Sequence, residues 1–110
     1  MSSKPSHSHG NEITATTFPA LRSFMRGYFH EDMTEEYGTL DEAVRQFCED
    51  ADAQERNTVA GEWHRFVVQT KGQSLAAINK ILAERLGSAC RLQADDFDKI
   101  TRAFEGLPPD

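Results

Sequence analysis

Long hydrophobic runs are missing from this chain of 110 residues. No segment approaches the roughly 18 consecutive apolar residues that a membrane-spanning helix requires, so we expect no membrane contact. Residues 1–16 are polar and contain no apolar stretch of the kind found in secretory signals, so we expect a cytoplasmic protein. The same polarity predicts a disordered N-terminal arm over residues 1–16, ahead of one folded domain over residues 17–107.

Cysteine is scarce as well. Cys48 and Cys90 lie far apart, and neither has a further ligand residue at the spacing of a metal site. Two cysteines carry little information about a disulfide, and the cytoplasm keeps thiols reduced. We therefore expect two free thiols, one of them buried on a helix face.

Catalytic and phosphate-binding motifs are also absent from the sequence. It contains no GxSxG, no HExxH and no glycine-rich phosphate loop, although a glutamate and a histidine can act together as acid and base. His30, which two acids follow, could contribute to a metal site; the alternative is that it lies at the C-terminal end of a helix, where positive charge is favourable. We expect no enzymatic activity, no cofactor and no metal.

Basic residues are few in the middle of the chain. Between Glu31 and Glu62, eleven acids are opposed by two arginines, which gives this segment a formal charge of −9 in a chain whose total is −6. Nucleic acid is a poor ligand for such a chain, because contacts with phosphates need a basic surface. A basic protein is a better partner. The alternative is that the acids only solvate exposed helix faces.

What the sequence does contain is helical periodicity. Apolar residues recur at steps of three and four in several segments, and no segment shows sustained alternation, although LGSACRLQ leaves room for a short strand. The pattern predicts an all-α fold, a compact bundle of about five short helices. The expected helices cover residues 18–29, 40–51, 52–70, 74–86 and 95–105, with an acidic turn between the first two.

Two local signals refine this prediction. Thr39 and Glu42 have the spacing of a capping box, which places the start of the second helix. Large apolar residues share one face in each helix, and they predict a single core. The residues expected in that core are Phe24, Phe29, Phe47, Trp63, Phe66, Leu82 and Phe104.

Short motifs follow a fixed order between residues 18 and 47. FPAL begins the series, followed by GYFH, Asp32, YG, EA and Phe47. This ordered set resembles the N-terminal signature of one family of immunity proteins from bacterial contact-dependent growth inhibition systems. Met33 departs from the family pattern, which usually has tryptophan there. Methionine keeps the position apolar, so the departure puts a contact of that ring in doubt rather than the fold.

The resemblance implies a non-catalytic, cytoplasmic protein that binds the C-terminal toxin domain of a large surface-delivered protein. Such toxins are often nucleases, so the expected partner is a basic protein, bound by a monomer in a one-to-one complex. Two alternatives to this function remain. One is a general helical adaptor, and the other is a small metal or redox sensor that uses His30, Cys48 and Cys90.

The expected partner-binding residues surround the predicted acidic turn. Carboxylates there would meet a basic toxin surface, and a tyrosine among them can anchor an interface. Asp41 and Glu42 have an alternative role as helix-start residues. The set comprises Glu31, Asp32, Glu35, Glu36, Tyr37, Asp41, Glu42, Glu49 and Asp50.

Overall fold

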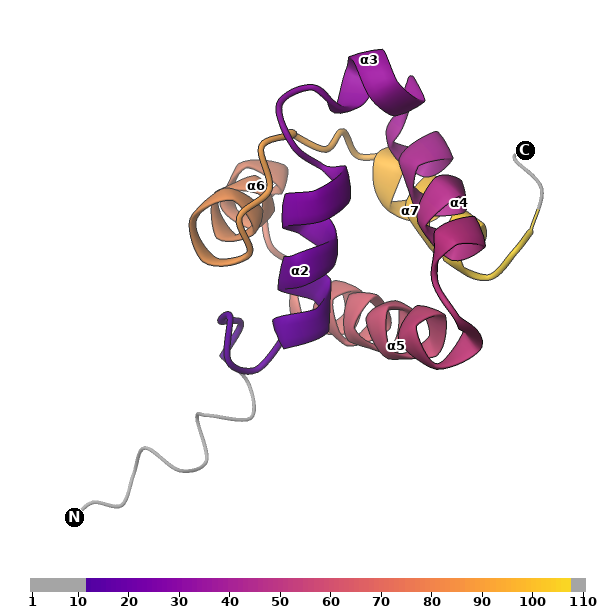
Figure 1. Cartoon of the computed structure of the whole chain (residues 1–110). Helices are drawn as coiled ribbons and strands as arrows, with labels where there is room; N and C mark the ends of the chain where they lie inside the picture. Colours follow the sequence, from indigo (N-terminus) through magenta and orange to yellow (C-terminus); the bar gives the residue numbers. More distant parts are fainter. Residues whose placement is uncertain (1–11, 108–110) are drawn as a thin grey trace.

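Every regular element in residues 12–107, the part of the chain that the computed structural model describes, is a helix (Figure 1). The all-α prediction is therefore confirmed, including the absence of a strand from these residues. The helices are α2 (Pro19–Tyr28), α3 (Met33–Tyr37), α4 (Leu40–Asp50), α5 (Ala53–Gln69), α6 (Leu75–Arg85) and α7 (Asp96–Phe104). Five of them fall in predicted helical segments. The short helix α3 replaces the predicted acidic turn.

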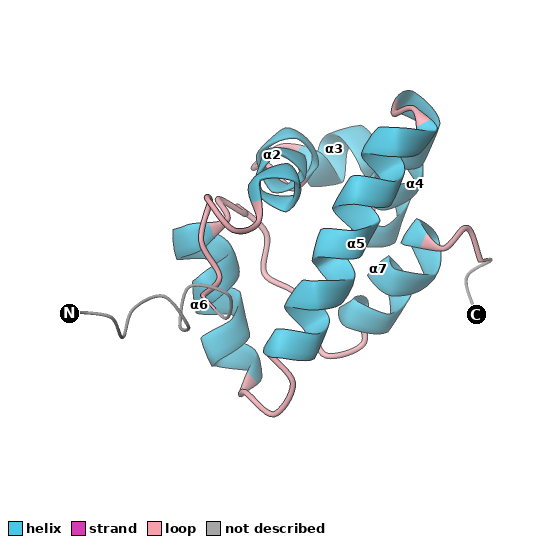
Figure 2. Ribbon diagram, turned by 90° about the horizontal axis from the view of Figure 1, so that it is seen from below, coloured by secondary structure: helices cyan, strands magenta, loops and turns pink. Residues whose placement is uncertain are grey.

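The helices pack around α2 and α5. Helix α5 crosses beneath α2, while α6 lies on one side of α2 and the pair α4 and α7 lies on the other (Figures 1 and 2). Helix α2 contacts α4 and α5, and α7 contacts α4 and α5. Helix α3 packs on α4 at one end of the bundle. None of the helices in residues 12–107 combines the length and hydrophobicity that a membrane crossing requires.

One apolar core connects these helices. Six of the seven predicted core residues are buried, and Phe104 is half-buried against the same cluster. Phe24 lies at the centre of an aromatic group, with ring centroids 5.1 Å from Phe29 and 5.0 Å from Phe47. The indole N–H of Trp63 donates to the hydroxyl of Thr101 over 2.8 Å, so this buried ring has a partner for its polar atom.

Side chains in the sequence fix where the helices begin. Pro19 occupies the first turn of α2, where a missing N–H leaves no partner unsatisfied. Asp52 accepts from the backbone N–H of Glu55 at the start of α5, and Ser74 accepts from that of Ala77 at the start of α6. These caps satisfy amides that have no partner inside the helix.

The segment between α6 and α7, where the sequence LGSACRLQ left room for a short strand, forms no strand. A buried asparagine holds it in place. The side-chain N–H of Asn79 donates to the carbonyl of Leu92 over 2.9 Å, and its oxygen accepts from the backbone N–H of Leu92 over 2.7 Å. The backbone N–H of Ala89 donates to the carbonyl of Phe29 over 2.9 Å, next to the end of α2. A side-chain amide thus supplies the pairing that a neighbouring strand would give.

The packed part of the chain begins earlier than residue 17. Ile13 is 6 % exposed and belongs to the core, and its carbonyl accepts from the guanidinium of Arg85. The backbone N–H of Phe18 donates to the carbonyl of Thr14 over 2.9 Å, which leads the segment into α2. The predicted arm must therefore end before Ile13. Residues 1–11 lie outside the described residues, and their disorder stays a prediction.

Two truncations separate these parts of the N-terminal segment. A chain that starts at residue 12 should keep the free energy of unfolding of the full chain. A chain that starts at residue 17 should lose about 2 kcal/mol, because it no longer buries an isoleucine side chain. Urea denaturation measures both values. Equal stability of the two truncated chains would contradict a structural role for Ile13.

Candidate partner-binding surface

Helix α3 is tied down at several points, although it spans only Met33–Tyr37. Met33, at the position of the family tryptophan, is 4 % exposed and anchors the helix in the core. His30 Nδ1 accepts from the backbone N–H of Asp32 over 3.1 Å, and His30 Nε2 lies 2.8 Å from a carboxylate oxygen of Glu36. His30 follows the end of α2, as the helix-end alternative expects, and it connects α2 to α3.

A glycine and a capping box join α3 to α4. Gly38 has a φ of 94°, in the region that favours glycine. The hydroxyl of Thr39 accepts from the backbone N–H of Glu42, while the Glu42 carboxylate accepts from the backbone N–H of Thr39 over 3.1 Å. The predicted capping box is therefore confirmed. A Cβ atom at position 38 would collide with the Glu42 carboxylate.

Replacing Gly38 with alanine should destabilise the protein by about 1–2 kcal/mol, because the side chain is strained at positive φ and also displaces Glu42 from its cap. Urea denaturation measures the change. Gly27→Ala is the matched control, since a Cβ there meets nothing within 4 Å. This helical substitution should stabilise by about 0.5–1 kcal/mol. Equal effects at the two positions would contradict the special geometry of Gly38.

Two tyrosines meet where α2, α3 and α4 come together. The rings of Tyr28 and Tyr37 stack with centroids 5.5 Å apart and planes 25° apart. The Tyr28 hydroxyl donates to Asp50 over 2.7 Å. Burial, followed by the hydrogen bond to Asp50 and its charge, raises the pKa of Tyr28 far above its ordinary value. Both rings are half-buried.

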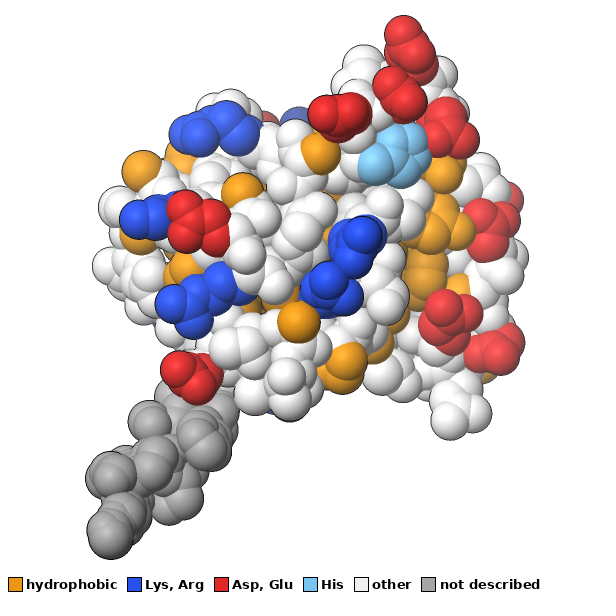
Figure 3. All heavy atoms as spheres, turned by 60° about the vertical axis from the view of Figure 1, so that its left-hand side comes forward, with side chains coloured by type: hydrophobic (Ala, Val, Ile, Leu, Met, Phe, Trp, Pro, Cys, Tyr) orange, Lys and Arg blue, Asp and Glu red, His pale blue; other side chains and the backbone are white. Residues whose placement is uncertain are grey.

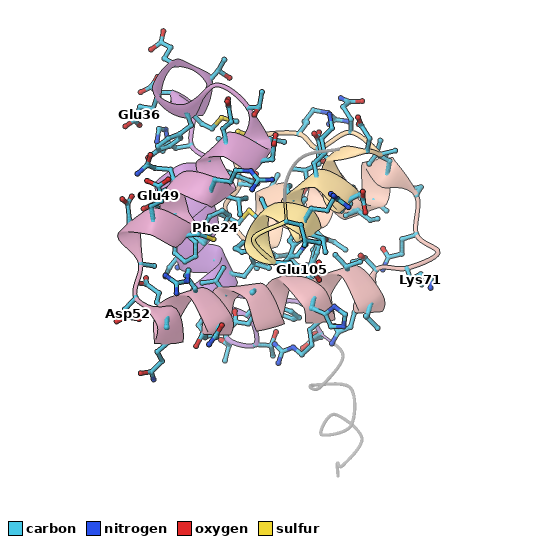
Figure 4. All side chains as sticks on the ribbon, turned by 90° about the vertical axis from the view of Figure 1, so that its right-hand side faces the viewer. Phe24, Glu36, Glu49, Asp52, Lys71 and Glu105 are labelled. Carbon is cyan, nitrogen blue, oxygen red and sulfur yellow. The ribbon has the colours of Figure 1, made fainter. Side chains whose placement is uncertain are left out.

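Carboxylates surround this tyrosine pair and form what we call the acidic edge. In Figure 3, acidic side chains gather at the level of α3 and continue down the same side of the molecule. Figure 4 places Glu36, Glu49 and Asp52 along one side, on α3, on α4 and at the start of α5. All acids of the edge are exposed. The acidic edge comprises Glu31, Asp32, Glu35, Glu36, Glu49 and Asp50.

The charge of the acidic edge is poorly balanced. Glu36 pairs with His30, but no Lys or Arg among the described residues forms an ion pair with any acid of the edge. Several basic side chains lie on other helices: Arg22 and Arg26 are on α2, and Lys80 and Arg85 are on α6. Two come near the edge without an ion pair: Arg56 donates to the carbonyls of Cys48 and Ala51 at the end of α4, and Arg91 lines one hollow with Glu31. In Figure 3, the basic side chains lie away from the acidic right-hand side, with some acidic side chains beside them.

Asp41 and Glu42 have different surroundings from the acidic edge. They line a cavity of about 320 Å³ between α4 and α7, together with the cations Arg45, Lys99 and Arg102. The Thr39 hydroxyl lies 2.9 Å from the Asp41 carboxylate, and Glu42 belongs to the capping box. Local cations and the helix start account for these two acids, which favours the alternative role anticipated for them.

Of the three residues named for a metal or redox sensor, two lie close together: the Cys90 thiol donates to the backbone carbonyl of His30 over 3.7 Å, whereas the Cys48 thiol donates to that of Ala103. In residues 12–107, no group of three or more His, Cys, Asp or Glu side chains could hold a metal ion. Cys48 and Cys90 are both free and half-buried, so neither is the fully buried thiol that was expected. Burial raises the pKa of both thiols, and Arg56 and Arg45 oppose this effect only at Cys48. A raised pKa reduces the reactive thiolate fraction at neutral pH.

Comparison with known families places the chain in one of them. Residues 17–101 match the sequence profile described as CdiI immunity protein, a span that runs from before α2 into α7. The chain belongs to the CdiI immunity protein family. The resemblance noted between residues 18 and 47 is thereby confirmed, and membership implies a protein that neutralises a toxin. Searches of curated proteins and of solved structures give no match.

Sequence reasoning missed one part of this surface. Tyr28 is absent from the expected binding residues, yet its hydroxyl reaches the acidic edge at Asp50. The two residues are 22 positions apart and lie on different helices, so no local spacing could reveal the contact. The identity of Tyr28, a ring with a polar tip, was the one available signal.

Proposed function

We propose that this immunity protein inactivates a basic toxin domain by docking its acidic edge against the toxin's substrate-binding cleft. The observation that carries the proposal is the row of exposed carboxylates that form no ion pair with a Lys or Arg of residues 12–107, held around two stacked tyrosines. Charges of one sign attract a partner of the opposite sign over long range and raise the association rate. The tyrosine rings then offer apolar area for close contact.

A nuclease is the toxin class that fits such a surface best. Its cleft must present lysine and arginine side chains to hold the phosphates of RNA or DNA. Carboxylates delivered by α3 and by the end of α4 would occupy the positions of those phosphates. The protein itself supplies no chemistry in this mechanism and works by occlusion, as a cytoplasmic monomer in a one-to-one complex.

Co-expression with the cognate toxin domain tests the proposal. The two proteins should purify together, light scattering should give a one-to-one mass, and the complex should not degrade RNA that the free toxin degrades. A toxin domain of unrelated sequence serves as the control and should neither bind nor be inhibited. A stable complex that still cleaves RNA would rule out occlusion of the cleft.

A further inference from the structure

An aromatic row leads from the core to the acidic edge. Phe24 is 3 % exposed and stacks on Tyr28, with centroids 5.4 Å and planes 11° apart. Tyr28 stacks in turn on the half-buried Tyr37. Phe47 meets the Tyr28 ring edge-on at 5.5 Å, so the inner part of the row is fixed from two sides. Core packing thus holds the outermost ring, Tyr37, in one place at the surface.

Two carboxylates are positioned beside this outer ring. Asp50 accepts from the Tyr28 hydroxyl over 2.7 Å and from the Gln46 amide over 3.0 Å, so both of its oxygens are oriented by neutral donors. Glu36 is oriented by His30. Burial raises the pKa of Tyr37, and the charges of Glu36 and Asp50 raise it further, as expected for carboxylates close to the phenol.

We propose that Tyr37, Tyr28, Asp50 and Glu36 form a receptor for one arginine side chain of the toxin. The inference rests on the proposed function and names the partner group at the centre of that surface. A guanidinium can lie flat on an aromatic ring while its N–H groups donate to carboxylates at the side. The charge-assisted bonds gain strength where the rings exclude water.

The chain already uses this geometry elsewhere. The guanidinium carbon of Arg65 lies 4.3 Å from the centre of the Phe18 ring, and the same group donates to the carbonyl of Thr17 over 2.6 Å. In that pair one planar group satisfies a ring and an oxygen at once. Lysine lacks the planar group, so it should occupy the tyrosine site less well.

The number of tyrosines makes a direct test possible. The sequence contains two, Tyr28 and Tyr37, so isotope labelling of tyrosine rings places every NMR signal in the proposed receptor. The full chain is titrated with the blocked peptide acetyl-Gly-Arg-Gly-amide, and in parallel with its lysine and citrulline analogues. Citrulline keeps the shape of arginine without its charge.

The arginine peptide should shift the Tyr37 signals with a dissociation constant of about 1–10 mM, in the range of a single exposed contact. The lysine peptide should bind at least about threefold more weakly, and citrulline should cause no shift. Asp50→Asn keeps an acceptor for the Tyr28 hydroxyl but removes the charge. It should weaken arginine binding about tenfold. Glu84→Gln, an equal charge change on α6, should leave it unchanged.

Three results would overturn the receptor. They are an absence of shifts up to about 50 mM peptide, equal binding of citrulline, and unchanged affinity in Asp50→Asn. The toxin complex provides the separate check on the proposed function. If the toxin complex forms but the peptide does not shift the tyrosine signals, the arginine receptor is wrong and the proposed function stands. If the arginine peptide binds but the protein forms no complex with the toxin, the proposed function is wrong.

Discussion

Replacing Phe47 with alanine is expected to lower the free energy of unfolding by about 3–5 kcal/mol. Phe47 is 3 % exposed, and its ring meets Phe24 at 5.0 Å, Tyr28 at 5.5 Å and Phe104 at 6.2 Å. The truncated side chain leaves a cavity among rings that α2, α4 and α7 hold in place, so the site has little freedom to collapse. Urea denaturation, with circular dichroism as the signal, gives the change.

An exposed apolar residue serves as the control for this truncation. Val68 on α5 is 58 % exposed, and Val68→Ala should change the free energy of unfolding by less than about 0.5 kcal/mol. If Phe47→Ala behaved like Val68→Ala, the aromatic group could not be the centre of the core.

The second large effect concerns association. Reversing Glu35 and Glu36 to lysine should slow association with the toxin domain about tenfold or more at low salt, because the leading carboxylates become repulsive. Both side chains are exposed, and the one ion pair lost, between Glu36 and His30, lies at the surface, where such a pair contributes at most about 1 kcal/mol, so the melting temperature should fall only slightly. Stopped-flow mixing at several salt concentrations measures the rate. For the parent protein it should fall steeply as salt rises.

A double reversal elsewhere controls for net charge. Glu84 on α6 and Glu105 after α7 are exposed, and lysines at both positions change the total charge by the same amount. This control should associate nearly as fast as the parent. Equal slowing in both variants would mean that net charge alone governs the encounter. No slowing in the Glu35 and Glu36 variant would move the interface away from α3.

Local signals predicted most of the fold, because they are properties of neighbouring residues. Helical periodicity placed five helices, and Thr39 with Glu42 placed the start of α4 through contacts three residues apart. Helix α3 escaped prediction because one turn is too short to show a period, and because its stability comes from Met33 in the core and from the His30–Glu36 pair. Ile13 was missed for a similar reason: its partners lie far along the chain.

The surface could be predicted only in part. Charge density identified the carboxylates near α3 from the sequence alone, since acids that are neighbours in a turn stay neighbours in space. The sequence could not predict which of those acids have cations beside them and which do not, because this depends on the position of α7. That helix brings Lys99 and Arg102 beside Asp41 and Glu42, whereas no acid of the acidic edge forms an ion pair with a Lys or Arg of residues 12–107. Pairing between distant helices therefore decides which carboxylates remain available.

The separation of charge across the molecule has a further consequence. The acidic side chains on the side of α3 have few basic neighbours, whereas Arg22 and Arg26 on α2 and Lys80 and Arg85 on α6 lie on another side (Figure 3). This uneven distribution gives the protein an electric dipole along with its net charge. The field of a basic partner exerts a torque on such a dipole and turns the molecule before contact. Collisions then begin with the acidic side foremost. Dissolved salt would reduce the share of collisions that start in the right orientation, as well as their number.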